Sequence, residues 1–453
     1  MLDIPDQQFQ GTTMPKLPSL DITNAGLDRK TLQSYAQRMT GEAKALEKAT
    51  KTAYQDDRCS INLPVDKQIL KQTKALAKKH QNADAIVVCG IGGSNLGTMA
   101  VQEAMLGKLH NQSGKRPAVF YADTVDTFAL TDLLAILTRR LKKGKSVIIN
   151  GVSKSGGTTE TTANFEILVD LLKKHDKNYA DHVVVTTDEG SPFWKLANAK
   201  GFHHLAIPKK VGGRYSVFSA VGQYPLRVMG INVDELLKGA ADMQQACLEP
   251  DIMKNPAMQH AALLHHHASH GKAIADLFLF ATDLESIGKW YRQLMGESIG
   301  KEWNASHTKQ VFAGITPTVS IGSTDLHSMA QLYLGGPKDK FTSFVTVESA
   351  NGLRVPPDAA YETLVLHIQG VKLPSIMDAI FQGVSIAYQK GVRPSCHILL
   401  HGKTAYQIGA LLQMHMIEMI HLGKLMDVNS FDQPNVEAYK IETKTILSGI
   451  QKR

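Results

Sequence analysis

Apolar and polar positions alternate along the 453-residue chain in two repeating patterns. Short, almost wholly apolar runs predict strands buried on both faces, and longer segments with apolar residues every three or four positions predict amphipathic helices. In the first half, the predicted strands are Ala85–Cys89, Ala118–Tyr121, Ser146–Asn150, His182–Thr187 and His204–Ile207. Helical patterns between them cover Leu96–Leu109, Leu130–Leu141, Thr159–Lys173 and Pro192–Ala199. This alternation predicts an α/β fold, with a parallel sheet covered by helices on both faces.

The same alternation starts again near Gly230. The predicted strands there are Ala273–Ala281, Val319–Ile321, Phe341–Val347 and His397–Leu400, with helical patterns at Asp283–Leu294 and Thr404–Met426. Helical spacing from Asp28 to Tyr54 precedes both units. We therefore predict three parts, which are a helical arm over residues 1–60 that packs on the second unit, a first α/β unit over 61–230, and a second over 231–453 that ends in helices.

Composition argues against several classes of protein. The formal net charge is +8, from 50 Lys and Arg against 42 Asp and Glu. The chain has no dense run of basic residues, which argues against a nucleic-acid partner. No stretch approaches the roughly 18 apolar residues of a membrane span, and Met1–Asp6 lacks the basic and apolar regions of an export signal. The four cysteines (Cys59, Cys89, Cys247 and Cys396) are far apart and fit no metal-ligand spacing. These features predict a cytoplasmic protein.

Two turns rich in glycine and hydroxyl residues each follow a predicted strand. One reads Gly90-Ile91-Gly92-Gly93-Ser94-Asn95, and the other reads Ser153-Lys154-Ser155-Gly156-Gly157-Thr158-Thr159-Glu160. Glycine lets a backbone approach an anion closely, and free N–H groups at a helix start point towards it. Asn95 stands where a dinucleotide fingerprint needs its third glycine, and Gly157 stands where a P-loop needs its lysine. The pair predicts a site for a phosphorylated small molecule; for either turn alone, a tight structural connection is the alternative.

Three further segments carry candidate chemistry. Arg214 lies within Val211–Ser216, where a guanidinium held between glycines and a small polar residue can present a planar fork to an oxyanion. Glu297 stands between glycines after a predicted helix and has the chemistry of a general base. His327 lies near a predicted helix start, and histidine is a side chain suited to acid–base chemistry. Taken alone, Arg214 is equally consistent with a surface loop, while a residue such as Glu297 is more often a solvated helix-end residue and a lone histidine is usually structural or on the surface.

The C-terminal segment Phe431–Lys440 has a helical spacing. Gln433, Glu437 and Lys440 stand at i, i+4 and i+7, which is one face of a helix if the segment is helical. An exposed amphipathic helix is the alternative.

A histidine cluster lies further back in the chain and consists of His260, His265, His266, His267 and His270. His266 and His270 share a helix face, but no HExxH pattern accompanies them. We predict a solvated, histidine-rich helix here rather than a metal centre.

Three motifs occur in a specific order, Gly-Gly-Arg-Tyr-Ser at 212–216, Gly-Glu-Ser-x-Gly-Lys at 296–301, and Phe-Asp-Gln…Val-Glu-x-x-Lys at 431–440. With the first glycine turn, they resemble the phosphoglucose isomerase family in its shorter bacterial form, over nearly the whole chain. The resemblance implies two sugar-isomerase (SIS) domains, each a flavodoxin-like three-layer αβα unit, in a homodimer without metal or cofactor. It implies conversion of glucose 6-phosphate to fructose 6-phosphate through ring opening and a cis-enediol, in glycolysis and gluconeogenesis.

The resemblance also implies a role for each candidate residue. Glu297 would move the proton between C2 and C1, and Arg214 would stabilise the enediolate. His327, donated by the neighbouring subunit at the dimer interface, and Lys440 would move the ring-oxygen and hydroxyl protons, while Gln433 orients the sugar. The phosphate would be held by Ser153, Lys154, Ser155 and Thr158, with Gly93 and Ser94 nearby.

The chain departs from the family pattern at two positions. Asn435 stands where the family usually has glycine, and asparagine is the next best residue if a positive φ is needed there. Gly157 stands where threonine is common, which predicts the loss of one hydroxyl contact to the phosphate.

Three other functions fit some of these features. A non-catalytic sugar-phosphate sensor would use both glycine turns, but it has no need of a base. An isomerase that also accepts mannose 6-phosphate would differ at residues that the motifs do not fix. A DNA-binding SIS regulator would need a helix-turn-helix domain, which the N-terminal arm does not clearly supply.

Overall fold

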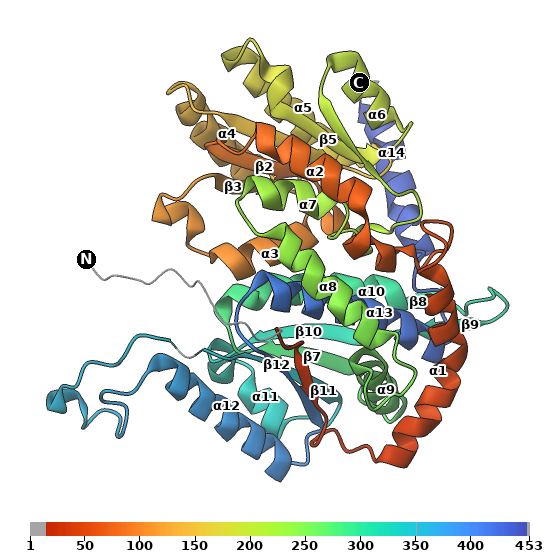
Figure 1. The fold of residues 1–453 in the computed structure, drawn as a ribbon, viewed down its shortest axis with the longest axis vertical. Coiled ribbons are helices and arrows are strands. Elements are labelled where there is room, and N and C mark those ends of the chain that lie inside the picture. Colours follow the sequence, from red (N-terminus) through yellow and green to blue (C-terminus); the bar gives the residue numbers. More distant parts are fainter. Residues whose placement is uncertain (1–14, 350, 451–453) are drawn as a thin grey trace.

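The computed structural model describes residues 15–349 and 351–450, and most of it is two five-stranded sheets with helices around and between them (Figure 1). Residues 1–14, which belong to the predicted arm and include the segment tested for an export signal, lie outside the described part. Helices cover both faces of each sheet, so the predicted three-layer α/β units are confirmed. No helix within the described ranges combines the length and apolar character needed to cross a membrane.

The first sheet is wholly parallel, in the order β3-β2-β4-β5-β6. Its strands are β2 (Ala85–Cys89), β3 (Ala118–Ala122), β4 (Val147–Val152), β5 (Val183–Asp188) and β6 (His203–Ile207), so all five predictions are confirmed. The chain adds β3 on one side of β2 and the later strands on the other. Winding therefore reverses between β2 and β4, and in such sheets ligands bind at that reversal, beyond the carboxyl ends of the strands. The two glycine-rich turns follow β2 and β4.

Alternate residues of β2 face opposite helical layers. Ala85 and Val87 share a buried cluster with the outer helices, and Ile86 and Val88 share another with the inner ones. The outer helices are α4 (Thr127–Leu141), α5 (Thr159–His175) and α6 (Pro192–Lys200), and the inner ones are α2 (Lys67–Lys79), α3 (Leu96–Leu106) and α7 (Ala220–Val228).

The second sheet has the order β1-β12-β11-β7-β10 and is parallel except for β1. Its four predicted strands are confirmed as β7 (Ile274–Leu279), β10 (Thr316–Ile321), β11 (Lys340–Val347) and β12 (Ser395–Leu400). The sequence did not predict the edge strand β1 (Ser19–Asp21) or the small hairpin of β8 (Lys301–Trp303) and β9 (Gln310–Ala313). Strands of three or four residues are too short to show an alternating pattern.

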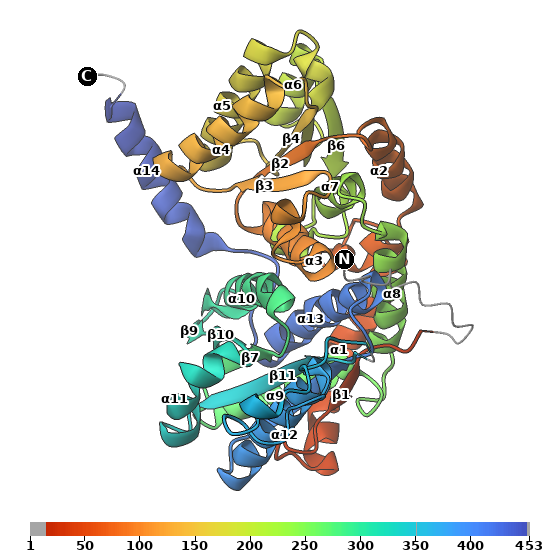
Figure 2. The same cartoon turned by 90° about the vertical axis from the view of Figure 1, so that its left-hand side faces the viewer.

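Helices of the second half lie on both sides of this sheet (Figure 2). They are α8 (Val233–Cys247), α9 (Pro256–Ser269), α10 (Glu285–Ile299), α11 (Ala330–Gly335), α12 (Leu373–Lys390) and α13 (Ala405–Leu425). Helices α11 and α12 cover one face through Tyr333 and Phe381, while α10 and α13 lie on the other face, towards the first sheet.

One continuous apolar core joins the two halves. It includes the inner faces of both sheets, and α3 of the first half packs against α10 of the second. The loops after β2 and β4 are therefore held at a fixed place relative to α10. We propose that the boundary between the two units lies near residue 230, because α7 ends beside the first sheet and α8 begins against α13.

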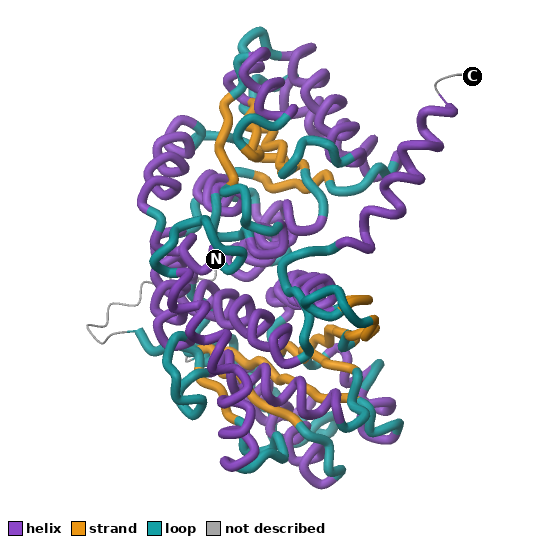
Figure 3. The backbone as a smooth tube through the Cα atoms, turned by 90° about the vertical axis from the view of Figure 1, so that its right-hand side faces the viewer, coloured by secondary structure: helices purple, strands orange, loops and turns teal. Residues whose placement is uncertain are grey.

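The two terminal helices behave differently. Helix α1 (Arg29–Ala49), capped by the Asp28 carboxylate, packs on α9 and α13. Helix α14 (Glu437–Ile450) has no buried residue and extends away from the rest of the chain (Figures 2 and 3). Its large apolar side chains Tyr439, Ile441, Ile446, Leu447 and Ile450 are between 41% and 65% exposed. An apolar surface of this kind indicates a protein partner.

Candidate active site

Arg214 lies at the centre of a buried hydrogen-bond network and is only 2% exposed. The short helix η5 (Gly213–Tyr215) presents it soon after β6. Its Nε donates to Ser298 Oγ (2.8 Å), Nη1 to Glu297 Oε2 (3.3 Å) and Gln433 Oε1 (3.1 Å), and Nη2 to the carbonyl oxygens of Ser430 (2.5 Å) and Asp432 (3.2 Å). All five N–H groups of the guanidinium therefore have an acceptor. The predicted site residues Arg214, Glu297 and Gln433 are in direct contact.

Glu297 lies in the last turn of α10, so the prediction that it follows the helix is wrong. The neighbouring Gly296 does not end the helix, because the N–H of Gly300 still bonds the Gly296 carbonyl at 3.0 Å. One turn earlier, Gln293 Nε2 donates to Glu297 Oε1 at 3.0 Å. Each carboxylate oxygen thus has one donor, and the side chain remains 29% exposed and open to a ligand. Gln293 was not among the site residues predicted from the sequence, although its position four residues before Glu297 on a helix would have indicated it.

The turn after β2 lies against this network. A Cβ atom added to Gly93 would be 2.2 Å from the carbonyl carbon of Gly213, so only glycine fits where the two loops meet. Gly92 has a φ of +61°, and a Cβ there would be 2.9 Å from Gln293 Nε2. The turn that carries Gly93 and Ser94 therefore lies beside Arg214 and the end of α10.

The turn after β4 has the features of an anion site. Ser153 is buried, and its Oγ accepts the Gly156 N–H at 3.1 Å and lies 3.3 Å from Thr158 Oγ1. Thr158 is the N-cap of α5, but its side chain does not cap the helix. The Thr158 side chain therefore does not occupy the N–H groups in the first turn of this 17-residue helix, which can bind an anion. Lys154 and Ser155 complete the turn with a cation and an accessible hydroxyl.

Lys301 holds the C-terminal segment against α10. Its Nζ donates to the Glu297 and Asp432 carbonyl oxygens, both at 2.6 Å, and pairs with the Asp432 carboxylate at 3.3 Å. Burial and the nearby Arg214 lower the pKa of Lys301. Lys301 ends the Gly-Glu-Ser-x-Gly-Lys motif, but no role for it was predicted from the sequence.

His327 and Lys440 lie apart from this network in the single chain. Gln433 precedes α14 and only Glu437 and Lys440 are in that helix, so the prediction of one helical face for all three is wrong. Lys440 Nζ pairs with Glu437 at 2.7 Å. His327 is exposed in η7 (Thr324–His327), beyond the end of β10.

The two departures from the family pattern are structurally mild. Asn435 does not adopt a positive φ, and its Nδ2 donates to Glu302 at 2.9 Å. A Cβ added to Gly157 would meet only Ser155 Oγ, at 3.5 Å, so a larger residue would fit there. At neither position does the backbone conformation or the packing require the residue that is present in this chain.

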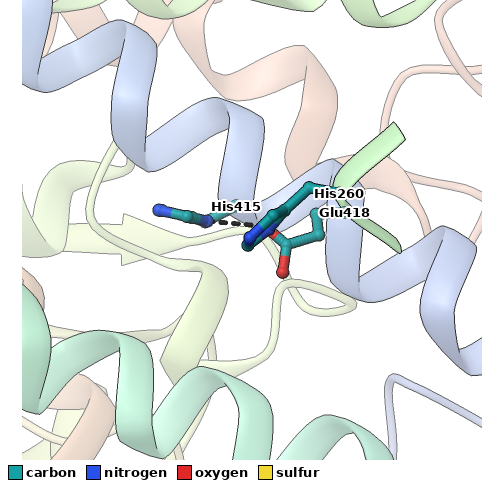
Figure 4. Close-up of side chains that lie close together, drawn as sticks. All are labelled: His260, His415 and Glu418. Carbon is teal, nitrogen blue, oxygen red and sulfur yellow. Dashed lines mark hydrogen bonds and ion pairs between the residues drawn. The ribbon is translucent and has the colours of Figure 1, made fainter. Parts of the chain in front are cut away.

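A fully buried cluster in the second half contains His260, His415 and Glu418, side chains that suit a metal ion (Figure 4). Glu418 Oε2 lies 2.6 Å from His415 Nδ1 and 2.8 Å from His260 Nδ1, and Tyr291 donates to Oε1 at 2.8 Å. A divalent ion about 2.0–2.2 Å from each ligand would hold these nitrogen and oxygen atoms further apart. The distances fit an ion-pair network, which we call the Glu418 cluster.

The predicted solvated histidine helix is therefore wrong for part of its length. His260 and His267 are buried on the inner face of α9, and His260 bonds Glu418 on α13 and Ser343 on β11. His266 and His270 lie at the outer end of α9, with their rings stacked 4.2 Å apart.

The chain has two α/β units with mainly parallel sheets and a turn suited to phosphate after β4. Its carboxylate–guanidinium pair lies against the glycine turn after β2, and together these features define an α/β enzyme of the phosphosugar-binding class. The family model described as phosphoglucose isomerase matches residues 68–357 and 372–453, and the chain belongs to this family.

Similar proteins agree with this assignment. The chain is 33% identical over 389 residues to a glucose-6-phosphate isomerase of Carboxydothermus hydrogenoformans, covering 84% of this chain and 82% of the relative. It is 35% identical over 393 residues to a glucose-6-phosphate isomerase of Clostridium novyi, covering 84% of each. Among solved structures, a hypothetical protein of Thermus thermophilus has a TM-score of 0.81 at 29% identity, covering 95% of this chain and all of the other. A Chlamydia trachomatis glucose-6-phosphate isomerase shares the fold, with a TM-score of 0.79 at 20% identity and coverage of 96% and 89%.

Proposed function

We propose that this protein interconverts glucose 6-phosphate and fructose 6-phosphate, with Glu297 as the base and Arg214 as the group that stabilises the enediolate. The observation that carries the proposal is the contact between these two side chains beside the glycine turn after β2. A sensor has no use for a partly exposed carboxylate held by a buried arginine. The reaction belongs to glycolysis and gluconeogenesis, and four unpaired cysteines support a cytoplasmic location.

The charge balance of the pair suits proton transfer next to a carbonyl. Before the reaction, the Arg214 cation is paired with the Glu297 anion at 3.3 Å. When Glu297 takes the proton from C2 of the open-chain aldose, it becomes neutral and the negative charge moves to the oxygen on C1. Arg214 Nη1 then donates to this oxygen instead of to the Glu297 carboxylate. The guanidinium cation therefore has a negatively charged partner both before and after the proton transfer. The hydroxyl proton on O2 then moves to O1, and return of the proton from Glu297 to C1 gives the ketose; the guanidinium cannot itself supply a proton.

The phosphate anchors the substrate at a distance from the reacting carbons. We assign it to Ser153, Lys154, Ser155 and Thr158 with the N-terminus of α5, and we place Gly93 and Ser94 along the sugar. Gln433, which shares Arg214 Nη1 with Glu297, orients the sugar hydroxyls. Holding a non-reacting group in this way keeps C1 and C2 within reach of the base.

We further propose a homodimer in which His327 completes the site of the neighbouring subunit. Two observations support it, the exposed position of His327 and the exposed apolar side chains of α14. His327 and Lys440 would then handle the ring-oxygen and hydroxyl protons during ring opening.

Subunit mixing tests this arrangement. Glu297→Gln and His327→Ala chains are each expected to be nearly inactive as homodimers. When they are co-expressed with different tags and the heterodimer is purified, one of its two sites has both native residues, so about half of the wild-type activity should return. If each subunit used its own His327, the heterodimer would stay inactive.

The reaction itself is tested by proton NMR of the protein with fructose 6-phosphate in D2O, without added metal. We expect glucose 6-phosphate to appear with deuterium at C2, because the proton on Glu297 exchanges with solvent. Bound but unchanged fructose 6-phosphate would instead support the sensor. Mannose 6-phosphate as a major product would direct attention to the residues that fix the C2 face.

A further inference from the structure

Two buried hydroxyl groups lie behind the Arg214 guanidinium. Ser298 is 0% exposed and Tyr215 is 1% exposed. Ser298 Oγ is 2.8 Å from Arg214 Nε and 2.9 Å from Tyr215 Oη, and Tyr215 Oη is 3.3 Å from the Ser430 carbonyl oxygen. Arg214 Nη2 contacts the same carbonyl at 2.5 Å, so the four groups form a closed ring.

The direction of every hydrogen bond in this ring is fixed by its members. A guanidinium N–H can only donate and a carbonyl can only accept. Ser298 Oγ accepts from Arg214 Nε, and it is also the donor to Tyr215, because the single proton of Tyr215 goes to the Ser430 carbonyl, which can only accept. Tyr215 then donates to the Ser430 carbonyl, which also accepts from Nη2. Burial raises the pKa of Tyr215, which keeps this hydroxyl protonated and able to donate.

The ring occupies one edge of the guanidinium and leaves the other edge to the substrate. Both partners of Nη1, Glu297 and Gln433, are accessible side chains that a ligand can replace. The partners of Nε and Nη2 are buried Ser298 and two backbone carbonyls, of which that of Ser430 is buried and that of Asp432 is held by Lys301. We propose that Ser298 and Tyr215 are positioning residues, which fix the plane of Arg214 so that Nη1 points at the developing enediolate oxygen. This inference rests on the proposed role of Arg214. A shift of about 1 Å in such a group can cost about 100-fold in rate.

The test compares Tyr215→Phe and Ser298→Ala with wild type, and each in an Arg214→Lys background. We expect each single variant to lower kcat about 10-fold or more while KM stays within about threefold, because the lost interaction acts mainly in the transition state. In the Arg214→Lys background, the same changes should have little further effect, because no guanidinium remains to be oriented. Tyr224→Phe is the matched control, since Tyr224 is 0% exposed and its hydroxyl bonds His80 Nδ1 at 2.7 Å.

The outcomes separate this inference from the proposed function. If Arg214→Lys keeps the wild-type kcat, the proposed role of Arg214 fails. If Arg214→Lys is impaired while Tyr215→Phe and Ser298→Ala keep the wild-type kcat, the positioning role alone is overturned. An equal loss of kcat with and without Arg214 would also overturn it, because the hydroxyls would then act by another route. Having two hydroxyl variants keeps the test open if one of them does not fold.

Discussion

Replacing Glu297 with glutamine is expected to lower kcat for isomerisation by about 1,000-fold, within the usual range for loss of a general base. Glutamine has nearly the same shape, and its amide oxygen can still accept from Arg214, but it cannot take a proton from C2. The phosphate turn after β4 is unchanged, so KM or the dissociation constant of fructose 6-phosphate should change little. Steady-state kinetics and calorimetric binding measure the two effects separately.

Exchange at C2 gives this experiment a second readout. In D2O, the Glu297→Gln protein should bind fructose 6-phosphate and incorporate no deuterium. Glu285→Gln is the matched control, because it removes a carboxylate from the start of the same helix, where Glu285 pairs with Lys289 at 2.9 Å. Glu285→Gln should keep near wild-type kcat. Turnover close to wild type in Glu297→Gln would show that another group is the base.

The sheets were predictable because of how parallel sheets are built. A strand such as β2, with all five residues buried, must be apolar throughout, and this signal is visible in a single sequence. Both glycine turns follow from the same argument, since they come where strands β2 and β4 end. The errors lie where glycines do not end a helix, as at Glu297, and where a distant neighbour accommodates a buried polar side chain, as at His260.

Glu297 and His260 show the two kinds of error. Gly296 and Gly300 both suggest the end of a helix, but a Cβ at Gly296 would meet nothing within 4 Å and the helix continues past it. Because histidine is polar, His260 was predicted to be solvated. It is buried instead, because Glu418, 158 positions later in the chain, pairs with it in the core at 2.8 Å. Local pattern carries no information about either outcome.

The candidate site was predictable only in part for the same reason. Arg214, Glu297 and Gln433 are in contact in space, but their motifs are separated by most of the second half of the chain. Taken alone, each was consistent with a surface residue, and the resemblance to a family was needed to join them. The ring of Ser298 and Tyr215 is visible only once donors and acceptors are counted in three dimensions.

The Glu418 cluster carries the second large expected effect, on stability rather than activity. Burial opposes both charges, but His260 and His415 lower the pKa of Glu418, and Glu418 raises the pKa of His260. The Glu418→Gln change would leave His260 buried without its counter-charge, which typically costs about 3–5 kcal/mol. For a folding unit the size of the second one, residues 231–453, this cost corresponds to a fall in Tm of roughly 6–20 °C. Asp170→Asn, in an exposed pair with Lys174, should cost less than about 1 kcal/mol.

The pH dependence distinguishes loss of this ion pair from a simple packing defect. A carboxylate with a lowered pKa stabilises the fold above its ordinary value of 4.5 and loses this contribution as pH falls below it. A histidine with a raised pKa stabilises the fold below its ordinary value of 6.5 and loses this contribution as pH rises towards its folded value. The Tm difference between wild type and Glu418→Gln should therefore be largest between about pH 4.5 and 6.5 and smaller on either side. A difference that stays constant from pH 4 to 9 would mean that Glu418 acts through packing alone, because a packing contact does not titrate.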